Sequence, residues 1–145
     1  MADTVVGSVA TDGLPADPGE RVRVVVGRYR AALLAHRDGG RLVAGTFAGT
    51  GRTLRVAEVV VAALLEAGHP EEDAARLCWA LVHFTRGLTQ EEQSAPADDV
   101  RLPVADLAAE GCPALARIGV RLPAQDSYDA RFAFGLARLL DGDRP

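Results

Sequence analysis

The chain has 145 residues, of which 48% are hydrophobic and 5% aromatic, and its formal net charge is −4 at pH 7. This length suits one compact domain, and scarce aromatic residues beside abundant Ala, Leu, Val and Arg favour an all-α fold over a sheet. The negative charge argues against DNA contact by this chain alone, and no apolar run nears the about 20 residues of a membrane span. Because the first residues also lack the pattern of a signal peptide, we expect a cytoplasmic protein with no membrane partner.

Apolar residues at three- and four-residue steps predict the first long helix, over residues 18–35. The segment HRDGG at residues 36–40 ends it, and a short helical turn over residues 41–44 leads into a glycine-rich loop at residues 45–51. That loop lacks the lysine and the preceding strand of a phosphate-binding loop, so the sequence does not favour nucleotide binding.

Two further helices are predicted next. Residues 52–67 are apolar around most of the helix circumference, which indicates burial on several sides. The following helix opens at residues 69–72, where Pro70 fits the first turn and the acidic residues favour the positive end of the helix dipole. This helix is expected to run to about Gln93.

The last third of the chain is less regular. Residues 94–103 are polar and acidic with two prolines, which predicts an exposed, mobile loop. Short helices are expected over residues 104–110 and 113–118, and Asp126 or Ser127 is expected to cap a final helix over residues 128–140. Cys78 and Cys112 lack metal-like spacing, and both are expected to be small buried hydrophobes.

Two stretches, YRAALLAHRDGGRLVAGT at residues 29–46 and WALVHFTRGLTQEEQ at residues 79–93, precede FAFGLARLLDG at residues 132–142. Together they resemble the effector-binding domain of the tetracycline-repressor (TetR) family. The resemblance implies an all-α helical bundle in which the helices ending at Gln93 and Gly142 pair with their twofold copies as a four-helix bundle. Residues 18–145 would form the effector-binding and dimerisation domain. Residues 1–17 would be a remnant of the connector helix and loop, without the helix-turn-helix that the family places before it.

The sequence itself also favours a homodimer. The two helices named by the resemblance carry more apolar surface, including Phe84 and Phe134, than one small domain can bury. The candidate interface residues, taken from both helices, are Trp79, Val82, Gly87, Phe132, Gly135, Leu136 and Leu139.

The TetR family binds its small-molecule effector in a tunnel within each protomer. The residues that the resemblance assigns by position to this tunnel or its gate are Tyr29, Leu33, His36, Thr46, Phe47, Val60, Leu64, His83 and Glu91. Each also has an ordinary structural interpretation. The two aromatic residues could be core, the two histidines a helix cap and a hydrogen-bonding group of the bundle, and Glu91 a solvated charge.

The metal-binding positions of the tetracycline repressors are substituted in this chain. Val43 stands where the resemblance places the histidine that holds magnesium, and Phe47 and Ala48 stand at the neighbouring arginine and proline. A polar amide that grips the drug is replaced at Val25 and near Val60. We therefore expect no metal and no other cofactor, and an apolar or polycyclic ligand in place of the tetracycline–magnesium chelate.

Three functions remain open at this stage. The first is the ligand-sensing and dimerisation half of a TetR-type repressor, which would shift an equilibrium between DNA-competent and incompetent dimers. The second is a standalone protein that sequesters a metabolite or pairs with a full-length regulator. The third is a cofactor-free cyclase or isomerase of secondary metabolism that uses His36, His83, Glu91 and Tyr29 as acids and bases. No nucleophile–base motif supports the third function, so a non-enzymatic role is favoured.

Overall fold

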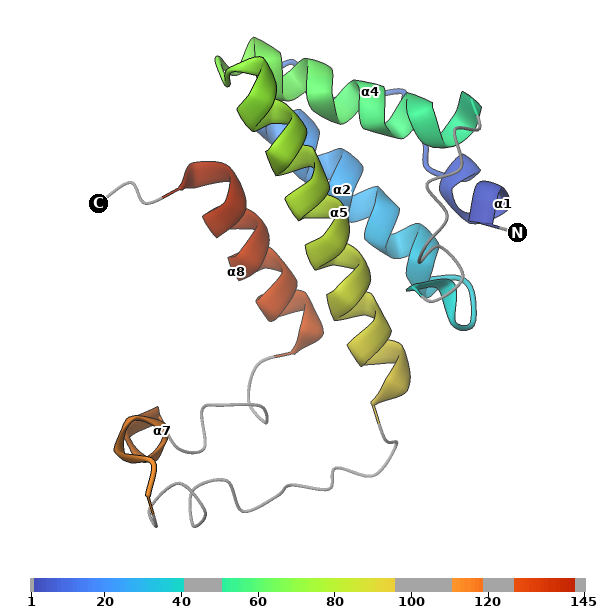
Figure 1. The fold of residues 1–145 in the computed structure, drawn as a ribbon. Coiled ribbons are helices and arrows are strands. Elements are labelled where there is room, and N and C mark those ends of the chain that lie inside the picture. Colours follow the sequence, from blue (N-terminus) through green and yellow to red (C-terminus); the bar gives the residue numbers. More distant parts are fainter. Residues whose placement is uncertain (1, 41–50, 96–110, 119–126, 143–145) are drawn as a thin grey trace.

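The computed structural model describes residues 2–40, 51–95, 111–118 and 127–142, and every regular element in these ranges is a helix (Figure 1). The helices are α1 (Ala2–Gly7), α2 (Pro18–Leu34), α4 (Gly51–Glu66), α5 (Glu71–Ser94), α7 (Pro113–Ile118) and α8 (Tyr128–Asp141). The all-α prediction is confirmed, and the long helices cover nearly the residues that periodicity predicts. The predicted turn at residues 41–44, the helix at 104–110 and most of the two long loops lie outside the described residues.

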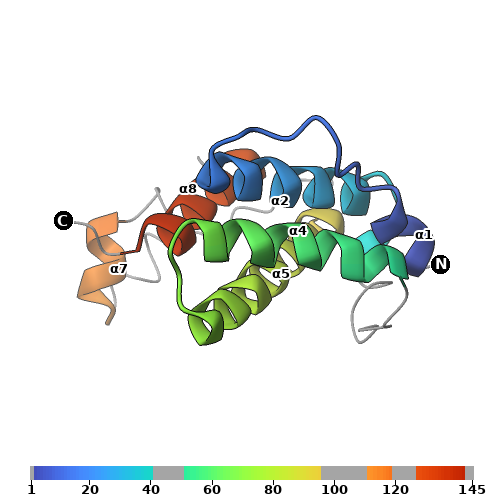
Figure 2. The ribbon, with the colours of Figure 1, turned by 90° about the horizontal axis from the view of Figure 1, so that it is seen from above.

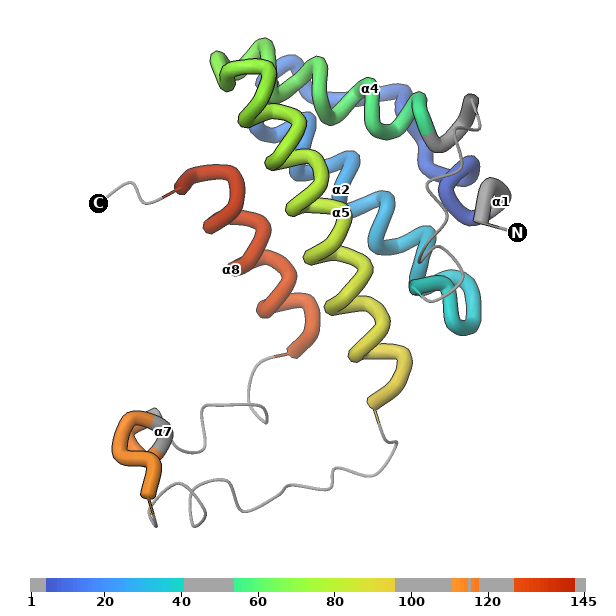
Figure 3. The backbone as a smooth tube through the Cα atoms, viewed as in Figure 1, coloured from blue at the N-terminus to red at the C-terminus, as the bar shows by residue number. Residues whose placement is uncertain are grey.

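The long helices form one packed group around α2 and α5. Helix α2 packs against α4 and α5, and α5 packs in turn against α8 (Figures 1 and 2). The short α1 lies across α2 and α4, at the side of the group away from α8. Figure 3 shows α7 set apart from the packed helices. No helix in the described ranges is long and apolar enough to cross a membrane.

Local sequence signals explain where the helices begin and end. The Asp17 side chain accepts a hydrogen bond of 2.8 Å from the Glu20 amide, and Pro18 occupies the first turn of α2. The Ser127 hydroxyl caps α8 by accepting from the Ala130 amide at 3.1 Å, which confirms the second of the two predicted caps. After α2, Asp38 adopts a positive φ of 58° and the chain turns away.

The hydrophobic core consists of two clusters. The larger joins α2, α4, α5 and α8 through Val22, Val25, Val26, Val60, Ala63, Leu64, Ala74, Leu81, Phe132 and Leu136. The smaller packs the first residues of the chain onto the end of α2 through Val5, Val6, Val9, Tyr29 and Leu33. Val56 on α4 lies against both clusters. The first helix is thus held by apolar packing on the same face of α2 that carries Tyr29.

Arginines on α2 fasten the segment between α1 and α2. Arg28 Nη1 donates to the carbonyls of Ala10 and Asp12, each at 2.8 Å. Arg21 donates to the carbonyls of Pro15 and Ala16 and pairs with Glu66 at 2.6 Å, which links this segment to the end of α4. These bonds hold the segment between α1 and α2 against α2, and so help to position α1.

Two expectations were wrong. Helix α4 is not buried on several sides, because Val60, Ala63 and Leu64 are buried whereas Leu54 and Leu65 are exposed. Cys112 is exposed because it lies just before α7, which is itself set apart. Cys78 is partly buried, as expected, and burial raises the pKa of its thiol.

Candidate functional site

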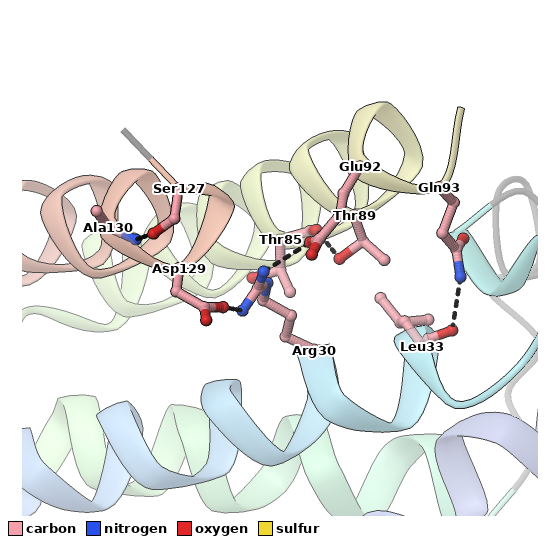
Figure 4. A network of polar contacts seen from close by, with 9 residues as sticks. All are labelled: Arg30, Leu33, Thr85, Thr89, Glu92, Gln93, Ser127, Asp129 and Ala130. Atoms are coloured by element: carbon pink, nitrogen blue, oxygen red, sulfur yellow. Dashed lines mark hydrogen bonds and ion pairs between the residues drawn. The ribbon is translucent and has the colours of Figure 1, made fainter. Parts of the chain in front are cut away.

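A buried arginine on α2 joins three helices (Figure 4). Arg30 is 7% exposed; its Nη1 donates to Asp129 Oδ1 on α8 at 2.5 Å, and its Nη2 to Glu92 Oε2 on α5 at 2.6 Å. The guanidinium also lies 5.0 Å from the centre of the Phe132 ring. Burial lowers the pKa of Arg30, but the bonds to Asp129 and Glu92 outweigh it and the net pKa is raised. Arg30, Glu92 and Asp129, called here the Arg30 triad, therefore form a charged crosslink at this level of the bundle.

Gln93, which follows Glu92 on α5, connects the end of α5 to the end of α2. Its Nε2 donates to the carbonyls of Leu33 at 3.1 Å and His36 at 2.9 Å, while its Oε1 accepts from the Gly40 amide at 3.2 Å. Gly40 allows this close approach, because a Cβ there would lie 3.2 Å from the backbone nitrogen of Gln90, which is a tight contact. The His36 carbonyl thus belongs to a structural junction.

Tyr29 and Leu33 occupy the face of α2 next to this junction. Both are buried, and both pack against Val5, Val6 and Val9. Burial raises the pKa of Tyr29 to about 12, and the nearby positive charge of Arg86 opposes this only in part. The phenol therefore stays protonated at neutral pH and can donate a hydrogen bond.

Several buried polar atoms near Tyr29 and Arg30 have no hydrogen-bond partner among the described residues. They are Thr85 Oγ1 and Arg86 Nε on α5 and Arg30 Nε on α2. Thr85 is fully buried, and its carbonyl accepts a bond of 2.8 Å from the Thr89 hydroxyl. Because buried polar atoms are nearly always paired in proteins, this part of the α2–α5 contact is where a ligand or ordered water is most needed.

The predicted effector residues fall into several groups. Val60 and Leu64 are buried in the larger core cluster, and Thr46 and Phe47 lie outside the described residues. His83 and Glu91 are exposed on α5, where the His83 ring stacks on Trp79 at 5.4 Å between ring centres. Among the candidates that the structure describes, only Tyr29, Leu33 and the His36 backbone come together, at the end of α2. Within the described ranges, no group of three or more His, Cys, Asp or Glu residues is placed to hold a metal ion.

The predicted interface residues divide between the protomer core and the surface. Phe132 and Leu136 belong to the larger core cluster. The Phe84 ring lies directly over Gly135, where a Cβ would be 2.2 Å from Phe84 Cζ. These three residues of α8 therefore form its contact with α5 in the same protomer.

The remaining candidates are more accessible. Trp79 and Gly87 are exposed, Val82 and Leu139 are partly buried, and Phe134 is 65% exposed on the outer side of α8. An apolar surface thus remains on both helices.

Sequence reasoning missed the polar residues of the interior. Arg30 shares a helix face with Val22, Val26 and Leu33, so a charge within a buried stripe was the available signal. Thr85 and Thr89 similarly continue the buried stripe of α5 after Leu81. The partners on α5 and α8 had no such signal, because Glu92 and Asp129 look like ordinary surface carboxylates.

Known proteins resemble this chain over most of its length. The family model for the tetracyclin repressor-like C-terminal domain matches residues 14–144. The Escherichia coli tetracycline repressor proteins of class E and of class A from transposon 1721 are 32% and 34% identical, each over 114 residues. Each alignment covers 79% of this chain but 51% and 52% of the relative. The chain therefore spans about half the length of these curated relatives.

Solved structures show the same similarity. A possible TetR family transcriptional regulator from Streptomyces coelicolor A3(2) superimposes with a TM-score of 0.73 at 40% identity, covering 97% of this chain and 71% of that one. The Q116A variant of TetR from Acinetobacter baumannii AYE, in complex with minocycline, gives a TM-score of 0.67 at 28% identity, covering 97% and 65%.

Proposed function

The chain belongs to the tetracycline-repressor (TetR) family, and we propose that it is the small-molecule-sensing and dimerisation domain of a transcriptional repressor. The matched part of the family is the C-terminal domain, and the curated relatives are about twice as long. The proposal therefore assigns DNA binding to a separate domain placed ahead of α1 in the full regulator.

The observation that carries the proposal is the packing of Tyr29 and Leu33 against Val5, Val6 and Val9. Tyr29 and Leu33 are effector candidates by resemblance, and the three valines belong to α1 and the turn after it. A molecule that displaces Tyr29 or Leu33 must change the packing of α1. It would then shift the population of α1 arrangements by its difference in affinity for them.

The proposed ligand is apolar or polycyclic and differs from the tetracycline–magnesium chelate. The resemblance places replaced polar drug contacts at Val25 and near Val60, and both valines are buried in the larger hydrophobic cluster. Val43, Phe47 and Ala48 supply neither the imidazole nor the guanidinium of the metal-dependent repressors. An apolar cavity with a few polar groups favours a ligand that is itself mainly apolar with a few polar groups.

The proposed dimer uses α5 and α8. Phe134 and Trp79 expose large apolar side chains on these helices, and Val82 and Leu139 are partly exposed. A twofold interface brings the same patch of each protomer together, so both helices would contribute from both copies.

A thermal-shift panel tests ligand sensing. Neutral and acidic polycyclic aromatic compounds would be compared with tetracycline in the presence and absence of magnesium, since a ligand that binds only the folded state raises Tm. We expect a concentration-dependent rise with at least one polycyclic compound and none that requires tetracycline and magnesium together. A magnesium-dependent rise with tetracycline would contradict the assigned ligand class, and a flat response to every compound would contradict sensing itself.

The alternative of a cofactor-free cyclase or isomerase has no comparable support. Tyr29 is protonated at neutral pH, and His83 and Glu91 are exposed and away from it. The intact mass of the native protein separates a full regulator from a standalone sequestering protein, since only the former exceeds the 15.2 kDa of this chain by a DNA-binding domain.

A further inference from the structure

Two neighbouring residues of α5 place unpaired polar atoms in the protein interior. Thr85 is fully buried with its Oγ1 unpaired, and Arg86 has a buried and unpaired Nε, counting all partners in the described ranges. An unpaired buried polar atom carries the full cost of its lost hydration. Unpaired polar atoms buried between helices therefore indicate a site where a bound molecule could supply the missing hydrogen bonds.

Arg86 also has no ion-pair partner among the described residues. Every ion pair recorded among the described residues uses Arg21, Arg23, Arg30 or Arg76. Arg30, also on the α2–α5 contact, has two carboxylate partners, whereas Arg86 has none within the part of the chain that the structure describes. A partly buried guanidinium without a counterion favours an anion over a neutral group.

The position of Arg86 connects it to the proposed effector site. Its positive charge opposes the larger effect of burial on the pKa of Tyr29, so the guanidinium lies within electrostatic reach of the phenol. Its backbone carbonyl lies at the Gly40 contact, where a Cβ would be 3.3 Å away, which sets the residue beside the end of α2. Tyr29 adds a protonated hydroxyl and an aromatic face to the unpaired atoms of Thr85 and Arg86.

We propose that Arg86, Thr85 and Tyr29 form a subsite for the acidic group of the effector, which is therefore an aromatic or polycyclic acid. This inference rests on the proposed sensing function and adds the chemistry of the ligand. The guanidinium supplies charge-assisted hydrogen bonds to the anionic oxygens, and the two hydroxyls complete the set. The apolar part of the ligand then lies against Tyr29 and Leu33.

A consequence separates this role from a structural one. If Arg86 serves a ligand, the ligand-free protein gains nothing from its charge, and Arg86→Gln leaves Tm unchanged or raises it. If Arg86 held the fold together, the same substitution would lower Tm. Arg76→Gln is the matched control, because Arg76 lies on α5 but is exposed and pairs with Glu72 and Asp73.

The test uses two probes with one aromatic framework: anilinonaphthalene sulfonate, which is anionic, and phenylnaphthylamine, its neutral counterpart without the sulfonate. Affinity and stoichiometry would be measured by calorimetry and fluorescence titration on the full chain, its Arg86→Gln and Thr85→Val variants and the Arg76→Gln control. We expect one sulfonate probe per chain, an affinity about tenfold or more weaker after Arg86→Gln, and a smaller loss after Thr85→Val. The neutral probe should bind all four proteins alike, and Arg76→Gln should match the unaltered chain.

Each other outcome overturns a defined claim. Equal affinity of the sulfonate for the unaltered chain and Arg86→Gln, or a clear fall in the Tm of the ligand-free variant, contradicts the acid subsite and leaves sensing intact. Failure of both probes to bind the unaltered chain contradicts the proposed function together with the subsite.

Discussion

Arg30 on α2 and Asp129 in the first turn of α8 are joined by a hydrogen bond of 2.5 Å, although 99 positions separate them in the chain. The same guanidinium holds Glu92 on α5. The helix that carries the effector candidates is thereby tied to both helices proposed to form the dimer bundle. A displacement of α2 must either carry these helices with it or break a buried charge pair.

Arg30→Ala should lower the free energy of unfolding by about 1–3 kcal/mol, which is below the about 3–5 kcal/mol of a fully buried broken pair because Asp129 is exposed. The reason is that Glu92 loses its partner and a cavity opens beside Phe132. Urea unfolding measures the change, with exposed Arg76→Ala as the control, for which we expect at most about 0.5 kcal/mol. Equal effects of the two substitutions would contradict a structural role for the Arg30 triad.

Gly135→Ala should destabilise the protomer by about 1–3 kcal/mol, because its Cβ would meet the Phe84 ring at 2.2 Å. Gly27→Ala is the control, since Gly27 lies in α2 with no atom within 4 Å of an added Cβ, and helix propensity then predicts a gain. Thermal unfolding compares the two variants. If the double variant Gly135→Ala with Phe84→Leu recovers part of the lost stability, the strain lies at the contact between these two residues. If it recovers none, the strain lies elsewhere.

Tyr29 should make stability fall at high pH. Its pKa in the folded protein is about 12, above the ordinary value of 10.0, so folding favours the protonated phenol. The contribution is fully present below pH 10 and is lost as pH rises from 10 to 12, reaching about 2–3 kcal/mol at most.

Denaturant unfolding between pH 8 and 11.5 measures this dependence, and Tyr29→Phe should flatten the part due to Tyr29. Tyr128→Phe on α8 is the control for the loss of a tyrosine hydroxyl outside the buried core. A Tyr29→Phe curve as steep as that of the unaltered chain would show that other groups cause the alkaline loss.

Phe134→Glu should disrupt the proposed homodimer, because it replaces the most exposed large apolar side chain of α8 with a charged one. Sedimentation velocity should then report a monomer where the unaltered chain is a dimer. Leu54→Glu on α4 is the matched control and should remain dimeric. Dissociation by Leu54→Glu, with Phe134→Glu still dimeric, would move the interface to α4.

The sequence predicted the helices well because regular apolar spacing and caps act locally. Ser127 and Pro70 mark helix starts by chemistry that needs no distant partner. Contacts between distant segments were harder to foresee. Phe132 and Leu136 looked like dimer residues because an apolar face has the same pattern whether it packs within a protomer or between two. The contact between Gly135 and Phe84 depends on how α5 and α8 pack, which the spacing of residues along the chain does not indicate.

The candidate site was predicted only in part. Tyr29 and Leu33 lie where a ligand would reach α1, but the polar groups beside them come from α5 and were not foreseen. The position of Thr85 on the buried stripe of α5 indicates burial, but nothing in the sequence indicates that the polar atoms of Thr85 and Arg86 would lack partners. Their significance depends on burial, which a single sequence encodes only through the whole fold.

Hydrogen exchange in residues 2–10, with and without saturating anilinonaphthalene sulfonate, tests the central claim most directly, because Val5, Val6 and Val9 pack with Tyr29 and Leu33. The account predicts that binding of one probe per chain changes the exchange rates of the α1 amides, while those of the exposed α7 stay the same. Stoichiometric binding with unchanged exchange in α1 would contradict the claim that this domain senses its ligand through the first helix.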